Sequence, residues 1–321
     1  GLNNSGNGYL YILNAHSGQV MYKIPTLVDG VAVGSNGSPS GLNKLNAWID
    51  QPSDNTAARF YAGDMLGNLW RFNATTAEDL AAPGPSTADT RSFRVARFVV
   101  NGQGQPLTVR PELAEIQGQA LLLIGTGRYL GISDASDLSS TNSVYAIKDP
   151  LGSDTGWGDV RANTGALVEQ TLTQLEANTA TGQPAKRIIS DNTVDWSEDG
   201  IAGWYLDLPD DGERIFVPMD LSSTRLTFAS LVPSESPCSD SGYSWLFTLD
   251  IRTGSFVKEN ATDQAVATLS SVAVTGVSTI GGKQVVTGGD GSTTVSNEPP
   301  PPGGAGGLRR TSWREIVPTP Q

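Results

Sequence analysis

Few residues in this sequence have the chemistry for catalysis or for soft-metal ligation. His16 is the only histidine and Cys238 is the only cysteine. A Ser-His-Asp triad could therefore be built only around His16, and a site with several histidine or thiolate ligands is excluded. His16 lies in Asn-Ala-His-Ser-Gly, which favours an ordinary turn residue. Cys238 is either a neutral surface or half-buried thiol or the partner of a cysteine outside this chain.

The glycine-rich segment Gly125-Thr-Gly-Arg-Tyr-Leu-Gly131 superficially resembles a phosphate-binding loop. However, no helical pattern follows it and no Lys-Ser/Thr pair completes the motif. We therefore expect a strand that ends in a glycine turn, with Arg128 paired to an acid or stacked on an aromatic ring. Four aspartates lie in turn-like segments, where local hydrogen bonding is their usual role: Asp134, Asp137, Asp191 and Asp195.

The clearest element that could position such residues is a hairpin within residues 59–76. Phe60 to Asp64 and Leu69 to Asn73 are short runs of aromatic and branched residues, and Gly67-Asn68 indicates the turn between them. Asp64 suits the first position of a type I turn, and Gly67 suits a residue with positive φ.

Both faces of this hairpin are apolar. Phe60 and Ala62 alternate with Tyr61, and Trp70 and Phe72 alternate with Leu69. A sheet with one wet face would alternate apolar with polar residues, so this one should be covered on both sides. The pattern favours an all-β fold of packed small sheets, a β-propeller, and leaves a β-sandwich core as the alternative.

Composition agrees with many short strands and numerous turns. The 321 residues include 37 Gly and 19 Pro, and 33 acidic against 21 basic residues give a net charge of −12. This charge argues against a nucleic-acid partner. No apolar run reaches the roughly 18 residues that a membrane span needs. The chain opens at Gly1-Leu2-Asn3 without an initiator Met or a signal peptide, so we expect a mature or excised piece.

One phrase, a strand followed by a polar turn, recurs along the chain and indicates repeated units. The copies span residues 8–18, 67–76, 143–152 and 244–254, and chance similarity among hairpins is the alternative. Further strands are predicted at Val20–Ile24, Leu45–Ile49, Phe93–Val100, Leu121–Ile124, Arg187–Ile189, Trp204–Leu208, Arg214–Val217, Leu226–Leu231, Ser271–Val277 and Lys283–Val286. About twenty strands at four per blade suggest about five blades. Leu167–Leu175 fits either a strand or a helix.

Three segments follow from these patterns. Residues 1–297 should hold the propeller blades, and residues 298–307, Glu-Pro-Pro-Pro-Pro-Gly-Gly-Ala-Gly-Gly, read as a low-complexity tether. Residues 308–321 begin with the strand-like Leu308 to Val317 and should contribute a terminal closing strand. Residues 75–90 are expected to form a flexible connection.

Several phrases in order resemble the C-terminal propeller of the PilC/PilY family of type IV pilus tip proteins. They are Phe60 to Phe72, Ile124 to Gly131, Gly203 to Pro209 and Ser312 to Ile316. The resemblance implies a modified β-propeller that is part of a larger ring, preceded in the full protein by a long N-terminal region that often resembles a von Willebrand A domain.

The resemblance also implies a calcium-type loop before the opening hairpin. In calcium-binding members, an EF-hand-like loop offers ligands at its positions 1, 3, 5 and 9. Here Asp50 and Asp54 match positions 1 and 5, but Pro52 and Ala58 fill positions 3 and 9. Calcium takes six to eight oxygen ligands, so we expect a degenerate loop with no calcium and no other cofactor, and keep an occupied site as the alternative.

The function implied by the resemblance is non-enzymatic: pilus assembly, retraction control and adhesion. Implied partners are minor pilins, a host or abiotic surface and the N-terminal part of the same protein, with the module exported to the pilus tip of a Gram-negative bacterium. Loops 27–43, 133–142 and 150–163 are the candidate contact surfaces. The alternative is a quinoprotein-dehydrogenase-like enzyme, whose propellers repeat Asp-x-x-Thr-Gly as Asp250 to Gly254 does, although neither its Cys-Cys pair nor its calcium ligands are found here.

Overall fold

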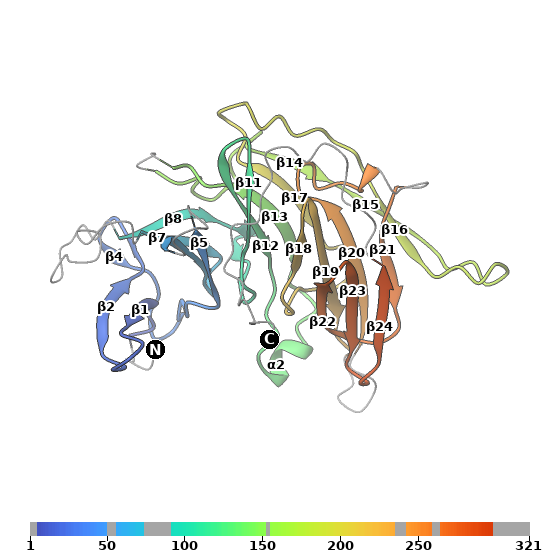
Figure 1. Ribbon diagram of the computed structural model, residues 1–321, viewed down its shortest axis with the longest axis horizontal. Helices are drawn as coiled ribbons and strands as arrows, with labels where there is room; N and C mark the ends of the chain where they lie inside the picture. The colour runs from blue at the N-terminus through green and yellow to red at the C-terminus, as the bar shows by residue number, and fades with distance from the viewer. Residues whose placement is uncertain are drawn as a thin grey trace, which may run out of the picture.

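The fold is a fan of mainly antiparallel sheets that radiate like propeller blades (Figure 1). The computed structural model describes residues 5–49, 56–73, 91–151, 155–234, 242–258 and 264–297. Within these ranges the helical content is one short helix, α2 (Ile132–Ala135). The predicted all-β class and the modified β-propeller are thus confirmed.

The predicted hairpin forms the centre of the first four-stranded sheet. This sheet runs in the order β5 (Leu45–Ile49), β6 (Ala57–Gly63), β7 (Asn68–Asn73) and β8 (Ser92–Arg97). Tyr61, Trp70 and Phe72 are fully buried, so both faces are covered as expected. Gly67 has φ +84°, and a Cβ there would lie 2.6 Å from the carbonyl oxygen of Phe98. Glycine is therefore required by both conformation and space.

Two larger sheets follow. The second has the order β11 (Glu112–Ile116), β12 (Gln119–Gly125), β13 (Ser143–Lys148), β17 (Gly203–Asp207) and β14 (Leu167–Gln170), with β14 parallel to β17. The third has the order β18 (Asp220–Ser222), β19 (Arg225–Val232), β20 (Tyr243–Asp250), β21 (Ala265–Ser270), β16 (Lys186–Ile189) and β15 (Leu172–Leu175).

The remaining strands form smaller sheets. Both ends of the described arc are formed by such sheets, β1 (Tyr9–Leu13) with β2 (Val20–Pro25) at one end and β22 (Val274–Ile280), β23 (Lys283–Gly288) and β24 (Thr293–Asn297) at the other. Two short hairpins, β3 (Leu27–Val28) with β4 (Val31–Ala32) and β9 (Val99–Val100) with β10 (Gln103–Gly104), lie within loops.

The four copies of the repeated phrase fall on β1, β7, β13 and β20, each in a different sheet. Counted from β5, β11 and β18, the strands β7, β13 and β20 are each third in their sheet. The phrase therefore marks one position of a repeated unit, which supports repetition over chance similarity.

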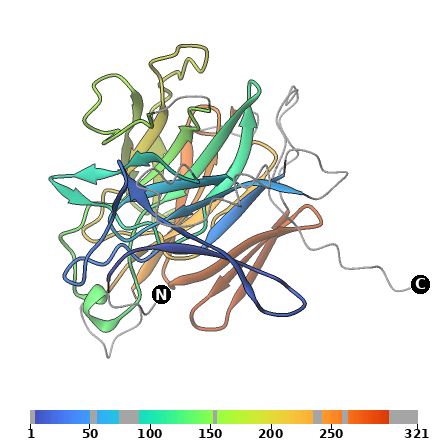
Figure 2. The same ribbon diagram turned by 90° about the vertical axis from the view of Figure 1, so that its left-hand side faces the viewer.

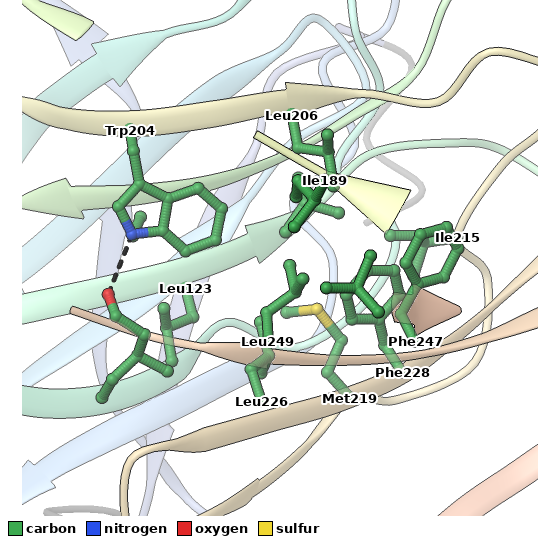
Figure 3. Close-up of a cluster of buried hydrophobic side chains, with 14 of the residues drawn as sticks. Leu123, Ile189, Trp204, Leu206, Ile215, Met219, Leu226, Phe228, Phe247 and Leu249 are labelled. Carbon is green, nitrogen blue, oxygen red and sulfur yellow. Dashed lines mark hydrogen bonds between the residues drawn. The ribbon is translucent and has the colours of Figure 1, made fainter. Parts of the chain in front are cut away.

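The largest apolar core lies between the second and third sheets (Figure 3). Trp204 is fully buried and its indole nitrogen donates to the carbonyl oxygen of Ile251 at 2.8 Å. Phe228 and Phe247 stack with their ring centroids 4.7 Å apart. Burial of such large side chains is the main stabilising term for facing sheets.

Most predicted strands are confirmed, with two informative differences. Arg214–Val217 is not a strand: Arg214 makes a single bridge to Leu231, because this segment crosses between two sheets. The ambiguous Leu167–Leu175 is two strands, β14 and β15, which belong to different sheets. The tether, the terminal segment 308–321, residues 75–90 and Cys238 lie outside the described residues.

Both end sheets expose apolar side chains. On the β1–β2 hairpin, Tyr11 and Leu13 are 42% and 53% exposed, and on the last sheet Ile280 and Val295 are 61% and 55% exposed. Propeller blades normally bury both faces against neighbours. In the part of the chain that is described, no helix is long and apolar enough to cross a membrane.

Candidate functional site

The predicted calcium-type loop connects β5 to β6, and Asp50 and Asp54 lie outside the described residues. β5 ends at Ile49 and β6 begins at Ala57. Over the described ranges, no group of three or more His, Cys, Asp or Glu side chains is placed to hold a metal ion. The degenerate, calcium-free loop therefore stays a prediction.

His16 and Asp195 make local hydrogen bonds, as predicted, whereas Asp191 makes an ion pair with a residue far along the chain. Asn14 Oδ1 accepts a hydrogen bond from the backbone N–H of His16 at 2.9 Å, and His16 is exposed. Asp195 accepts from the backbone N–H and the hydroxyl of Ser197 at 3.0 and 2.6 Å. Asp191 pairs with a lysine ammonium group at 2.7 Å. The contacts of His16 and Asp195 explain these two residues as local stabilisers of their turns.

The glycine-rich segment ends β12 and holds the β17–β18 connection against it. The backbone N–H of Ile215 donates to the carbonyl of Thr126 at 3.0 Å, and Thr126 Oγ1 accepts from the N–H of Ser143 at 2.7 Å. Gly127 has φ +140°, and a Cβ there would lie 2.6 Å from the Cβ of Arg214. The glycine thus permits close backbone approach rather than phosphate binding.

Arg128 is paired to an acid, which confirms the prediction. Its Nε donates to Asp134 Oδ1 at 2.6 Å, while Asp134 Oδ2 accepts from the backbone N–H groups of Leu130 and Gly131 at 2.8 and 3.1 Å. Burial raises the pKa of Asp134, but these hydrogen bonds and the Arg128 charge outweigh it and lower the pKa below its ordinary value. Asp134 is therefore an ionised anchor for this turn.

Two of the three predicted contact loops converge on one cleft of about 640 Å³. Ser38 from the first loop and Ser139 to Asn142 from the second line it, together with the tip of the β9–β10 hairpin. Met65 and Leu66, at the turn of the opening hairpin, form part of the wall. The rigid turn of the first sheet therefore supports a surface made by loops.

The cleft offers hydrogen-bonding groups. Its lining includes Asn101, Gln103 and Asp137. Hydrogen bonds from the Ser140 and Ser139 hydroxyls lower the pKa of Asp137, which stays an ionised acceptor. Such a lining suits a polar ligand or the polar surface of a partner protein.

The third predicted loop contributes to a different cleft, of about 470 Å³. Leu151 and Trp157 line it beside Lys148, and the indole nitrogen of Trp157 donates to the carbonyl of Lys148 at 2.8 Å. The Lys148 ammonium donates to the backbone carbonyl of Glu198 at 3.1 Å. Burial lowers the pKa of Lys148. Because residues of this loop line the second cleft and not the first, the three predicted loops do not form one surface.

Arg214 was missed by the sequence reasoning as a positioning residue. It is 2% exposed and its Nη1 donates to the carbonyls of Arg128 and Asp134 at 2.9 and 2.6 Å. Its Nη2 donates to the carbonyl of Asp137, beside the cleft. The available signal was a single arginine in the otherwise apolar run Arg-Ile-Phe-Val, since a buried guanidinium needs partners.

Comparison with protein families gives one match over more than half of the chain. The model of the PilY1 beta-propeller domain matches residues 2–185. Among solved structures, the crystal structure of the Pseudomonas aeruginosa PilY1 C-terminal domain superposes with a TM-score of 0.67 at 25% identity, and the match covers 92% of this chain and 68% of that domain.

Curated relatives agree with the structural match. The type IV pilus biogenesis factor PilY1 of Pseudomonas aeruginosa is 30% identical over 287 residues, which cover 78% of this chain and 24% of that protein. A PilY1 homolog of Xylella fastidiosa is 30% identical over 272 residues, covering 78% of this chain and 17% of the homolog. The chain thus spans a quarter or less of the length of these relatives.

Proposed function

We propose, from the premise that this chain belongs to the PilY1 β-propeller family, that it serves type IV pilus biogenesis as a rigid binding module. The observation that carries the proposal is the match of 92% of the chain to a PilY1 C-terminal domain. The convergence of two loops and the β9–β10 hairpin on one polar cleft supports a binding role on that scaffold.

The finer proposal places the module at the pilus tip on the cell surface, where it acts in pilus assembly, retraction control and adhesion. Its partners would be minor pilins, the N-terminal part of the same protein and a host or abiotic surface. The relatives are named biogenesis factors, which is not a class of enzyme. Alcohol-dependent dye reduction by protein supplied with pyrroloquinoline quinone and calcium would contradict a non-enzymatic role.

The proposal is tested by blocking the cleft without disturbing the core. Gln103 and Ser139 are exposed and line the cleft, so arginine at both positions adds bulk and charge there. The matched control places arginine at Gln174 and Thr179, which are exposed and do not line the cleft. Both variants gain the same charge.

We expect the cleft variant of the full-length protein to reduce surface piliation and adhesion, and the control to keep both. Equal behaviour of the two variants would show that the cleft is not the contact surface. Unchanged piliation in a strain that lacks the protein altogether would contradict the pilus function itself.

A further inference from the structure

The cleft of about 640 Å³ has a basic lining in an acidic chain. The charged residues among its described lining are one aspartate, Asp137, and three arginines, Arg97, Arg128 and Arg214. The whole chain, in contrast, has a net charge of −12. A cleft whose charge opposes that of its own protein concentrates anions locally. How an anion would be held depends on which N–H groups of the arginines are unused.

Arg128 has the most accessible guanidinium of the three. Its side chain is 45% exposed, and its Nε donates to Asp134 Oδ1 at 2.6 Å. In the described part of the chain, its Nη1 and Nη2 donate to no protein acceptor. These two nitrogens form a planar fork that matches the two oxygens of a carboxylate. Because the contact with Asp134 already orients the guanidinium, the fork is preorganised for an anion.

Arg214 holds the backbone that carries this fork, the exposed turn of residues 128–137. The guanidinium of Arg214 donates to three carbonyls of the turn, those of Arg128, Asp134 and Asp137. Ile132 in the turn is 91% exposed, and α2 lies at the margin of the molecule in both ribbon views (Figures 1 and 2). The turn is therefore open to solvent on the outside and fixed from the inside by one buried side chain.

The positive charge of Arg214 is not neutralised by its own hydrogen bonds. Its four acceptors are all backbone carbonyls, the fourth being that of Gly212. Arginine has five N–H donors, so one N–H of Nη2 is left after these bonds. Burial lowers the pKa of Arg214, and the charges of Asp137 and Asp134 offset this only in part. A bound anion would supply the missing counter-charge.

The β9–β10 hairpin adds further donors to the same cleft. Asn101 and Gln103 are exposed and line it. Asn101 has φ +51° and Gly102 has φ +77°, so the tip of the hairpin is a tight two-residue turn. Arg97, just before the hairpin, lies 3.5 Å from Asp159, which is longer than an ordinary charge-assisted hydrogen bond. The fork of Arg128 is thus accompanied by amide and guanidinium donors from a second element.

We propose that the cleft binds a carboxylate of a peptide, held across Nη1 and Nη2 of Arg128. The proposal rests on the binding role proposed above for this cleft and adds the chemistry of the ligand. The carboxylate is either an Asp or Glu side chain or the C-terminus of the bound chain, since both present the same pair of oxygens. The volume of the cleft lies in the range of sites that enclose small ligands, which suits a short segment.

The lining favours a peptide carboxylate over other anions. Hydrogen bonds from two serine hydroxyls keep Asp137 ionised, so a doubly charged phosphate would meet stronger repulsion than a singly charged carboxylate. None of the described lining residues is aromatic, which leaves no ring on which an acidic sugar could stack. The apolar lining residues suit an aliphatic side chain of a peptide, and they are Met65, Leu66, Val100 and Pro106.

The test uses the full-length protein and two random libraries of N-acetylated hexapeptides, one with amidated and one with free C-termini. We expect affinity selection to enrich peptides with Asp or Glu at a fixed position, or peptides from the free C-terminus library alone, which identifies the source of the carboxylate. Replacing that acid by its amide should weaken binding at least about tenfold, because the bidentate charge-assisted contact is lost. Enrichment without a required carboxylate, no enrichment, or binding of polygalacturonate in place of peptides would overturn the proposal.

Two variants place the carboxylate in the cleft. Arg128→Gln removes the fork, and Gln103→Glu adds a negative charge to the lining without changing the side-chain shape or the contact of Arg128 with Asp134. Each should weaken binding of the selected peptides at least about tenfold. The matched controls, Lys283→Gln and Gln183→Glu, make the same charge changes at exposed positions that do not line the cleft, and both should bind as the wild type does. Normal binding by Gln103→Glu would place the carboxylate elsewhere and overturn the proposal.

The pilus function is tested separately, in a strain that lacks the protein. Loss of pili in that strain, together with no carboxylate-dependent peptide, would reject the carboxylate site and leave the pilus function standing. Normal piliation in that strain, together with carboxylate-dependent binding that Arg128→Gln and Gln103→Glu weaken, would support the site and reject the pilus function.

Discussion

The guanidinium of Arg187 lies 2.7 Å from the carboxylate of Glu213, and both side chains are fully buried. Arg187 is on β16, while Glu213 belongs to the connection between β17 and β18, so the pair joins that connection to the third sheet. The ring of Trp245 lies 4.0 Å from the guanidinium, and the Ser230 hydroxyl also donates to Glu213. Because Glu213 precedes Arg214, this pair also fixes the residue that holds the exposed turn.

We expect Glu213→Ala to destabilise the protein strongly. The substitution leaves the Arg187 charge buried with a single remaining carboxylate, Asp210, at 2.7 Å. Removing one partner of a buried ion pair costs about 3–5 kcal/mol. Urea unfolding followed by tryptophan fluorescence measures the loss in the free energy of unfolding.

The control for this prediction is the exposed pair of Arg97 and Asp159, whose charged atoms are 3.5 Å apart. Arg97→Ala should change the free energy of unfolding by less than about 1 kcal/mol, because exposed pairs are screened by solvent. Equal losses from the two variants would show that burial of the Arg187 pair does not matter.

We expect Gly67→Ala to be more destabilising than Gly102→Ala. Both glycines have positive φ, +84° and +77°, so alanine is strained at either position. A Cβ at Gly67 would also lie 2.6 Å from the Phe98 carbonyl oxygen, whereas a Cβ at Gly102 meets open space. Overpacking adds about 1–3 kcal/mol, so chemical denaturation should separate the two variants by that amount.

The hairpin at residues 59–76 could be predicted from sequence because its alternation, its turn glycine and its apolar faces are all local. The sheet order could not be predicted in the same way. β14 and β15 look like one segment, yet Gln170 and Leu172 belong to different sheets. Pairing of β16 with β21 joins residues far apart in the chain, and no local pattern in Lys186–Ile189 indicates it.

The candidate site shows the same division. The sequence predicted that Arg128 pairs with an acid or stacks on an aromatic ring, and the structure shows the acidic partner, Asp134, six residues along the chain. The role of Arg214 was not predicted, since its acceptors at Arg128 and Asp134 are about eighty residues away. The exposure of Ile132 could not be predicted either, because an isolated aliphatic residue between polar ones can be buried or exposed. Which of the two occurs depends on the tertiary structure.

The turn at residues 128–137 should loosen in acid. Asp134 has a lowered pKa in the folded protein, so its stabilising effect is present above the unfolded value of 3.8 and is lost as the pH falls through the folded-state pKa. The pKa of Asp137 is lowered as well, by hydrogen bonds from Ser140 and Ser139. Amide chemical shifts of Leu130 and Gly131 should therefore move at acid pH.

Asp134→Asn separates the two aspartates. In this variant the chemical shifts of the Leu130 and Gly131 amides should no longer change at acid pH. Any change that Asp137 causes at other amides should persist. If the variant titrates like the wild type, Asp134 is not the group that holds the turn.

Among the described strands, β24 is paired on one side only, with β23, and we expect its other edge to be covered in the intact protein. β24 is the third strand of the last sheet, after β22 and β23, just as β7, β13 and β20 are the third strands of theirs. A fourth strand is therefore expected, and we expect Leu308–Val317 to supply it. Hydrogen exchange of the β24 amides should be faster in a chain that ends at Asn297 than in the chain of 321 residues. Equal exchange rates would place the terminal strand elsewhere.

The same count predicts a partner for β1. The repeated phrase lies on β1, as it lies on the third strands β7, β13 and β20, so β1 should be the third strand of its blade and β2 the fourth. The first two strands of that blade are then expected beside β1, at the edge that does not pair with β2. The exposed face formed by Tyr11, Leu13 and Met21 agrees with a blade that lacks its neighbour. Backbone N–H groups on such an edge pair readily with added strands.

Hydrogen exchange can decide this point. The amides of β1 that face away from β2 should exchange rapidly in the chain of 321 residues and slowly in a longer protein that includes preceding residues of the same propeller. The amides that already bond across the β1–β2 pair serve as the internal control, because their protection should change little. Rapid exchange at the free edge in both proteins would mean that β1 is an edge strand and that the repeated phrase does not fix its position in a blade.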